Sequence, residues 1–212
     1  MIRSSLAALF GTLMLGTFGS MSTASAQYRP VGAPRVALGN GPFIFDTAEQ
    51  HKIRVRVMAR GLEHPWSLAF LPNGDMLITE RPGRVRMIRD GVLSPKPVLA
   101  PTVFAFRNGG LFEITLHPKF AENRYVYLTY HKPLPNDKGA LALARGKWDG
   151  KRLVDTRDLF VTQPDSGTIS RLVFGRDGKL YMSTAGGDAQ DPGTHAGKIL
   201  RLNYAGTVPK DN

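Results

Sequence analysis

Residues 66–79 read Trp66-Ser67-Leu68-Ala69-Phe70-Leu71-Pro72-Asn73-Gly74-Asp75-Met76-Leu77-Ile78-Thr79, and this stretch decides the fold class. Two apolar runs flank a Pro-Asn-Gly turn, and Asn and Gly tolerate the positive φ angles that tight hairpin turns need. The stretch therefore predicts two antiparallel β-strands joined by a short turn.

The same pattern recurs further along the chain. Residues 170–184 repeat it with Asp177-Gly178 at the turn, and residues 111–118 lead through a longer turn to a second alternating run at 125–130. Each copy is followed by another predicted strand, at residues 84–89, 140–148 and 198–203. Hairpin-linked strands that recur every few tens of residues indicate the blades of a β-propeller, with a β-sandwich of irregular hairpins as the alternative.

The predicted fold class is therefore all-β, with about the first three blades of a propeller present. We place these blades near residues 51–100, 101–160 and 161–212. A closed ring of roughly four to eight blades needs more chain than this, and an open wedge would leave strand edges unpaired. We therefore expect a truncated chain whose propeller continues beyond Asn212.

The first 50 residues are expected to stand apart from the propeller. Residues 1–26 have the features of a cleaved signal peptide, with Arg3, an apolar stretch and the small residues Ala24-Ser25-Ala26. We expect cleavage after Ala26 and a secreted or periplasmic protein, with no membrane span in the mature chain. Residues 27–50 are rich in Pro and Gly and are predicted to form an extended N-terminal arm.

The chain is basic, with a formal net charge of +11, and it has no cysteine. The lack of cysteine excludes thiolate metal sites, iron–sulfur clusters and cysteine nucleophiles from these residues. Arg54 and Arg56, like Arg84 and Arg86, alternate along predicted strands, which places each pair on one solvated face. No nucleic-acid-binding motif accompanies the charge, so we predict no nucleic-acid partner.

A series of motifs runs from about residue 60 to the end of the chain. They are His64-Pro65-Trp66-Ser67, Thr79-Glu80-Arg81-Pro82-Gly83-Arg84, Gly109-Gly110-Leu111, His117-Pro118-Lys119-Phe120 and Gly197-Lys198-Ile199-Leu200-Arg201-Leu202-Asn203. In this order they resemble the motifs of the soluble pyrroloquinoline-quinone (PQQ)-dependent sugar dehydrogenases, the glucose/sorbosone dehydrogenase family.

The resemblance implies a six-bladed propeller that binds PQQ and calcium at one end of its central channel. It also implies oxidation of the C1 hydroxyl of an aldose to the lactone, with the quinone as hydride acceptor and an external electron acceptor as partner. This chemistry needs a general base for the hydroxyl proton and cations for the anionic cofactor. Most of the family's cofactor positions fall beyond residue 212, so the metal ligands are unknown.

Two family positions can be located on this sequence by their spacing from the motifs. The family's base histidine, four residues before Arg171-Leu172, falls on Gly167. Its cofactor-side glutamine falls on Asn108, whose shorter amide can still donate a hydrogen bond. We therefore take Asn108 as a candidate cofactor-binding residue, and we find no base at Gly167.

The segment between the predicted strands of the third blade supplies the other candidates. Asp188 and His195 are candidate catalytic residues, and Gln190 is a second candidate cofactor-binding residue. A structural role is the alternative for His195, and it is our interpretation of His64 and His117, which lie beside prolines at predicted turns.

Three functions remain open from the sequence. The first is an exported PQQ-dependent sugar dehydrogenase, and we expect this truncated chain to be inactive by itself. The second is a propeller of the same family that binds a ligand or partner without catalysis, which the replacement at Gly167 favours. The third is a lactonase-type propeller that hydrolyses its substrate with a central calcium ion.

Overall fold

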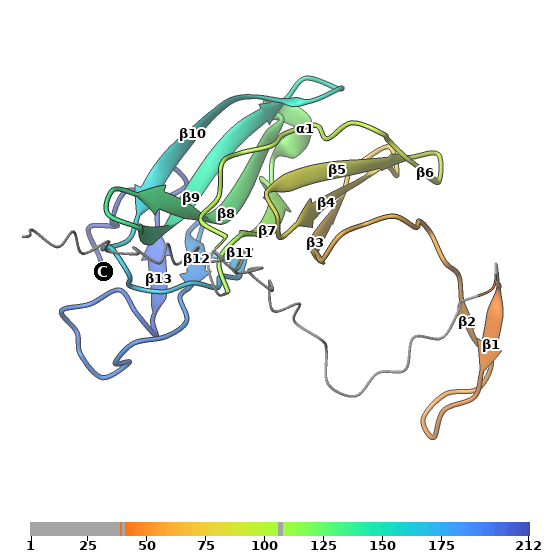
Figure 1. The fold of residues 1–212 in the computed structure, drawn as a ribbon, viewed down its shortest axis with the longest axis horizontal. Helices are drawn as coiled ribbons and strands as arrows, with labels where there is room; N and C mark the ends of the chain where they lie inside the picture. Colours follow the sequence, from red (N-terminus) through yellow and green to blue (C-terminus); the bar gives the residue numbers. More distant parts are fainter. Residues whose placement is uncertain (1–38, 40, 106–107) are drawn as a thin grey trace, which may run out of the picture. The chain divides into compact units, whose positions relative to one another are not determined.

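The computed structural model describes residue 39 and residues 41–105 and 108–212 (Figure 1). The chain divides into two units after Gly39, and every helix and strand described lies in the unit from Asn40 to Asn212. The predicted signal peptide (residues 1–26) and most of the predicted arm (residues 27–50) lie outside the described residues. The described end of the arm contains β1 (Phe43–Phe45), which pairs antiparallel with β2 (Ile53–Val55).

Three further antiparallel sheets follow one another along the chain, which confirms the predicted all-β class. The first two sheets have four strands each and the third has three, always in sequence order. Their strands are β3 (Pro65–Phe70), β4 (Met76–Glu80), β5 (Arg84–Arg89) and β6 (Val92–Leu93); β7 (Leu111–Leu116), β8 (Tyr125–Leu134), β9 (Lys138–Trp148) and β10 (Leu153–Val161); and β11 (Leu172–Phe174), β12 (Leu180–Ser183) and β13 (Ile199–Leu202).

The two predicted hairpin turns have the same backbone geometry. In the β3–β4 turn, Leu71 N–H donates to the Asp75 carbonyl (2.8 Å), and Gly74 has a φ of 87°. In the β11–β12 turn, Gly175 N–H donates to the Lys179 carbonyl (2.8 Å), and Gly178 has a φ of 72°. A residue with a side chain is strained at such angles, so glycine is favoured at both positions.

The second sheet turns differently between its first two strands. The short helix α1 (Phe120–Asn123) fills this connection, and the buried His117 organises it. The Nδ1 atom of His117 accepts a hydrogen bond from Lys119 N–H (2.9 Å) and lies 2.8 Å from Asn123 Nδ2. Burial, aided by the charge of Arg145, lowers the pKa of His117. These contacts fit the structural role predicted for His117.

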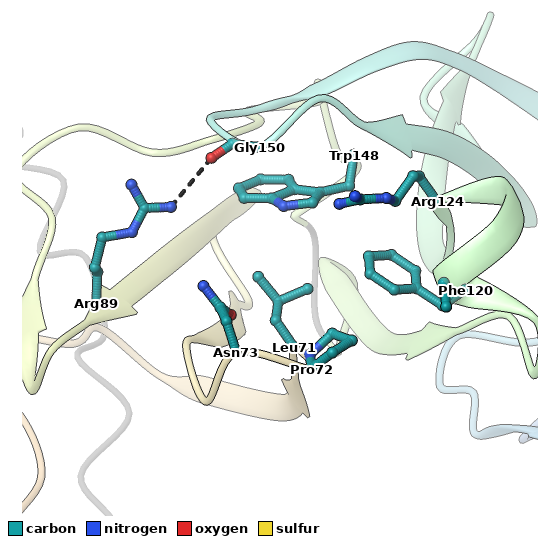
Figure 2. Close-up of a pocket in the computed structure, with 9 residues that line it drawn as sticks. Leu71, Pro72, Asn73, Arg89, Phe120, Arg124, Trp148 and Gly150 are labelled. Atoms are coloured by element: carbon teal, nitrogen blue, oxygen red, sulfur yellow. Dashed lines mark hydrogen bonds between the residues drawn. The ribbon is translucent and has the colours of Figure 1, made fainter.

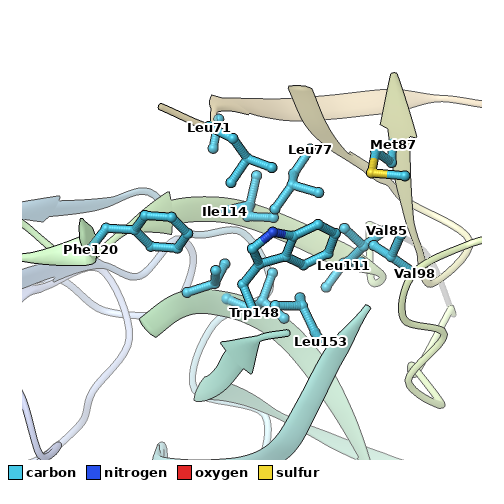
Figure 3. Packing of buried hydrophobic residues seen from close by; sticks show 13 residues of the cluster. Leu71, Leu77, Val85, Met87, Val98, Leu111, Ile114, Phe120, Trp148 and Leu153 are labelled. Atoms are coloured by element: carbon cyan, nitrogen blue, oxygen red, sulfur yellow. The ribbon is translucent and has the colours of Figure 1, made fainter. Parts of the chain in front are cut away.

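The middle sheet is buried on both faces, because the period-two alternation of its strands supplies apolar side chains to both. On β8, Val126 and Leu128 join the cluster shared with the first sheet, whereas Tyr127 joins the cluster shared with the third sheet. Figure 3 shows the first of these clusters, with Leu71 and Leu77 of the first sheet facing Ile114 and other residues of the second. Face-to-face stacking of successive sheets is the packing of propeller blades.

The first and third sheets leave apolar side chains exposed on the faces turned away from the middle sheet. Phe70 of β3 is 64% exposed and Ile199 of β13 is 75% exposed, whereas their strand neighbours Ala69 and Leu202 are buried. Contiguous exposed apolar patches typically mark surfaces that make further contacts. Within the described part of the chain, no helix has the length and hydrophobicity to cross a membrane.

Candidate functional site

All the candidate residues lie at one end of the three sheets, which we call the entry end. The first strands β3, β7 and β11 begin there, and the second strands β4, β8 and β12 end there. Backbone hydrogen bonds join the sheets at this end: Leu111 N–H donates to the Arg81 carbonyl (3.0 Å), and Asp165 N–H donates to the Gly139 carbonyl (2.7 Å). The opposite end, with the β3–β4 and β11–β12 turns and α1, is called the exit end.

Asn108 lies exposed at the entry end, immediately before the Gly109-Gly110 pair. Both glycines are needed for close backbone packing, since a Cβ on Gly109 would overlap the Phe104 carbonyl and one on Gly110 would overlap the Arg81 carbonyl. The glycine pair therefore sets the path of the chain, and Asn108 remains available to a ligand.

Gly167 is buried and has a φ of 126°, a conformation that side chains rarely adopt. A Cβ at this position would lie 2.9 Å from the Ala185 carbonyl oxygen and 3.3 Å from Thr184 Cβ. A histidine here would be strained by both the backbone and its neighbours. The loop is therefore built for glycine at the position where the family resemblance implies a base.

Asp188 and Gln190 are both exposed in the long connection between β12 and β13. The Asp188 carboxylate accepts a hydrogen bond from Gln190 N–H (2.9 Å), and the Asp188 carbonyl accepts one from Lys198 Nζ (3.2 Å). Among the described residues, no hydrogen bond connects either side chain to Asn108 or His195. The structure therefore brings these candidates to the same end of the sheets without joining them in one constellation.

His195 is engaged in packing between two loops. The His195 Nδ1 atom accepts a hydrogen bond from the backbone N–H of Gln163 (3.1 Å), and the backbone N–H of His195 donates to Gln163 Oε1 (3.2 Å). Its ring also meets the Phe160 ring edge-on, with 5.4 Å between centroids. In a neutral imidazole whose Nδ1 accepts, Nε2 carries the proton, so His195 has no free basic nitrogen in this arrangement.

His131, which the sequence analysis did not single out, is buried at the entry end and only 4% exposed. Its two ring nitrogens have no hydrogen-bond partner among the described residues. The ring fits a slot between Gly109 and Gly139, where a Cβ on Gly109 would lie 2.9 Å from Nδ1. Burial lowers the pKa of His131, although the Gly139 backbone and Asp165 act in the opposite direction.

The backbone of His131 also fixes the segment that presents Asn108. His131 N–H donates to the Gly110 carbonyl (2.8 Å), and the His131 carbonyl accepts from Phe104 N–H (2.7 Å). In the sequence His131 merely ends an alternating strand, and no motif marks it. Only the long-range pairing of the loop with β8 shows its position under the candidate site.

A chain of polar contacts links the first strands of all three sheets near the entry end. Ser67 on β3 donates a hydrogen bond to the Glu113 carboxylate on β7, and Arg171, just before β11, donates to its Oε2 (3.0 Å). Glu113 is only 12% exposed, whereas Arg171 is 64% exposed and lies over the Trp66 ring at 5.6 Å. These contacts hold the exposed Arg171 guanidinium in place at the entry end.

These residues fit an anionic quinone only in part. Arg171 and Asn108 supply a cation and a hydrogen-bond donor, the groups that an anionic cofactor needs. The described residues contain no group of three or more His, Asp or Glu side chains that could hold a metal ion. They therefore match part of a cofactor-binding surface, without a base at Gly167.

Stacked antiparallel sheets with polar loops at one end define this chain as part of a β-propeller with a candidate ligand site at its entry end. The family model for glucose/sorbosone dehydrogenase matches residues 62–212, and the chain belongs to this family. The resemblance inferred from the sequence motifs is therefore confirmed.

Named relatives agree with this assignment. The uncharacterized protein slr1608 of Synechocystis is 37% identical over 95% of this chain and 53% of its own length. Aldose sugar dehydrogenase YliI of Escherichia coli is 37% identical over 76% of this chain and 46% of its own length. The PQQ-bound aldose sugar dehydrogenase from Streptomyces coelicolor superposes with a TM-score of 0.60 and 30% identity, covering 74% of this chain and 50% of that one. The chain thus spans about half the length of the curated relatives it matches.

Proposed function

We propose that this chain forms the first blades of an exported PQQ-dependent sugar dehydrogenase that oxidises the C1 hydroxyl of an aldose to the lactone. Membership of the glucose/sorbosone dehydrogenase family over residues 62–212 is the observation that carries the proposal. A ring of the relatives' size would need about as much chain again. The substrate is a sugar in this family. Oxidation of an aldose and transfer of its electrons to an external acceptor are part of the proposal.

The residues described here have a binding role in this function. PQQ, when bound, accepts the hydride from the sugar. Asn108 would donate a hydrogen bond to the cofactor or substrate, and Arg171 would face the cofactor's carboxylates. Glu113 and Ser67 keep the Arg171 guanidinium in place through the contacts described above. Gln190 is a second candidate for the cofactor because its side chain is exposed at the same end.

We further propose that these 212 residues do not oxidise sugars by themselves. The backbone at Gly167 is incompatible with the base that the resemblance implies, and His195 Nδ1 is occupied by Gln163. Loss of a general base removes a factor on the order of 10²–10⁴ from the rate. For calcium, which the resemblance also implies, the described residues offer no cluster of three or more Asp, Glu or His side chains.

The test is the natural full-length protein reconstituted with PQQ and calcium. We expect saturable quinone binding by absorbance titration and dye-linked oxidation of an aldose. Absence of both would contradict the proposal. Export is tested separately by the mass of the secreted protein, which should begin at Gln27 if cleavage follows Ala26; a mature protein that retains residues 1–26 would contradict it.

A non-catalytic binding propeller is the second candidate function, and the buried, positive-φ Gly167 favours it. This candidate predicts that the full-length protein binds PQQ or a sugar and shows no turnover with any aldose. Turnover by the wild-type protein would exclude it. The same experiment therefore separates the two functions.

A further inference from the structure

A cavity of about 350 Å³ opens at the exit end, where the first and second sheets meet (Figure 2). Four structural elements surround it: the β3–β4 turn, the end of β5, the helix α1 with the residue that follows it, and the end of β9 with the turn after it. None of the candidate residues of the entry end lines it. Its volume lies within the range of small-molecule sites.

The floor of this cavity is apolar. Leu71, Phe120 and Trp148 belong to the buried cluster shared by the first two sheets, and the small part of each that stays exposed lines the cavity. Figure 2 shows the Trp148 indole extended above Leu71 and Pro72, between the side chains of Arg89 and Arg124. Such a floor favours a ligand with a planar apolar body.

The rim of the cavity supplies hydrogen-bond donors and positive charge. Arg89 pairs with the buried Asp75 (2.8 Å) and donates to the Gly150 carbonyl (3.1 Å). The hydrogen bond from Arg89 lowers the pKa of Asp75 despite burial. The Asp75 carboxylate is therefore ionised, and its charge cancels that of Arg89. No Asp or Glu is among the residues that line the cavity. The rim is therefore left with the positive charge of Arg124.

Arg124 occupies this rim in an unusual backbone conformation. It caps α1 with a φ of 59°, in the left-handed region where glycine or asparagine is usual. Its side chain is exposed and has neither a hydrogen bond nor an ion pair within the described ranges 41–105 and 108–212. In Figure 2 its guanidinium lies beside the Trp148 indole. A strained position that carries an unpaired cation next to an aromatic floor is a reason to look for a ligand.

We propose that the exit-end cavity is a binding site for a small planar carboxylate, whose carboxylate pairs with Arg124 while its ring lies against Trp148. Arginine binds carboxylates through two parallel hydrogen bonds, and the free edge of Arg124 can make both. The site goes beyond the proposed sugar oxidation, since it lies at the opposite end of the sheets. A polar sugar acid would satisfy Arg124 but would leave the apolar floor wet, so an aromatic or similar flat acid fits better.

The test uses the full-length protein and three probes: benzoate, benzyl alcohol and gluconate. Benzoate has both the ring and the charge, benzyl alcohol has only the ring, and gluconate has only the charge. Binding is followed by tryptophan fluorescence and by calorimetry. We expect benzoate to bind about tenfold more tightly than either other probe, and its fluorescence change to disappear in Trp148→Phe but persist in Trp66→Phe.

Variants separate the charge of Arg124 from other effects. Arg124→Gln should weaken benzoate binding about tenfold and leave benzyl alcohol unchanged. Arg176→Gln is the matched control, because Arg176 is also exposed at the exit end but belongs to the β11–β12 turn of the third sheet. Equal binding of benzoate to wild type and Arg124→Gln, or equal binding of benzoate and benzyl alcohol to wild type, would overturn the proposal. Quinone binding in the same preparation reports on the proposed function independently.

Discussion

The entry and exit ends of the same sheets use their polar groups in different ways. At the entry end, Asp188 bonds within its own loop and His195 bonds Gln163 of the neighbouring loop, whereas the ring nitrogens of the buried His131 have no partner among the described residues. At the exit end, the β3–β4 and β11–β12 turns repeat the same geometry, and the Arg124 side chain lies unpaired beside the apolar floor of the cavity. The comparison teaches that a residue's place in a motif says little about its availability, which depends on the bonds it already makes.

The largest effect is expected from Glu80, which ends β4 at the entry end and is fully buried. Its carboxylate binds Arg84 (2.6 Å) and Arg86 (3.4 Å). Burial alone would raise the pKa of Glu80, but the Glu63 amide and the two arginines hold it below its usual value. Glu80→Ala leaves Arg86 without its ion pair and Arg84 with only Glu63 as a partner, and it should cost about 3–5 kcal/mol of unfolding free energy in urea.

Glu122 provides the control for this prediction at the exit end. It is exposed on α1 and lies 4.0 Å from Lys119, so Glu122→Ala should cost less than about 1 kcal/mol. If the two alanine variants lost similar stability, the buried cluster at the entry end would not have the role assigned to it.

A pair of glycine variants compares the packing of the two ends directly. Gly167 at the entry end and Gly150 at the exit end both have positive φ angles, of 126° and 98°. A Cβ at Gly150 meets nothing within 4 Å, whereas one at Gly167 meets the Ala185 carbonyl at 2.9 Å. Gly150→Ala should cost about 1–2 kcal/mol for its backbone, and Gly167→Ala should cost clearly more in the same thermal or urea measurement. Equal costs would show that the loop at Gly167 adjusts freely.

The buried His131 predicts a pH dependence of stability. Its pKa is lowered in the folded protein, so the unfolded chain binds the proton more readily. Stability is therefore full above the ordinary histidine pKa of about 6.5 and is lost as the pH falls below it, by at most about 1.4 kcal/mol per pH unit for one group. His131→Leu should reduce this loss between neutral and mildly acidic pH. His117 contributes in the same direction, so an unchanged slope in His131→Leu would assign the effect elsewhere.

The smallest effect is expected from relieving the backbone at Arg124. Glycine accepts a φ of 59° without strain, so Arg124→Gly should be neutral or should stabilise the fold by up to about 1 kcal/mol. The same variant should lose the preference for benzoate over benzyl alcohol. If Arg124→Gly instead lowered the free energy of unfolding by more than about 1 kcal/mol, the Arg124 side chain would support the fold, contrary to its lack of described partners.

Local chemistry made much of the fold predictable. Asn73-Gly74 and Asp177-Gly178 form the expected hairpin turns, because their φ angles are a property of a few adjacent residues. The spacing from Arg171 placed Gly167 at the position that the structure shows to be built for glycine. These features depend on contacts within one segment, which a sequence displays directly.

The site could not be predicted as fully, because its contacts join distant segments. Gln163 and His195 are bonded across the third sheet's loops, and the link from Ser67 through Glu113 to Arg171 crosses three sheets. No motif signals such pairs. The exit-end cavity could not be predicted for the same reason, since Arg124 and Trp148 come together only through the α1 connection and the end of β9.

A quinone titration of the full-length protein tests most directly whether the two ends have separate roles. The account predicts saturable PQQ binding, followed by absorbance, that is weakened by Asn108→Ala at the entry end and unchanged by Arg124→Gln at the exit end. Absence of PQQ binding by the wild-type protein, or binding weakened by Arg124→Gln and not by Asn108→Ala, would contradict it.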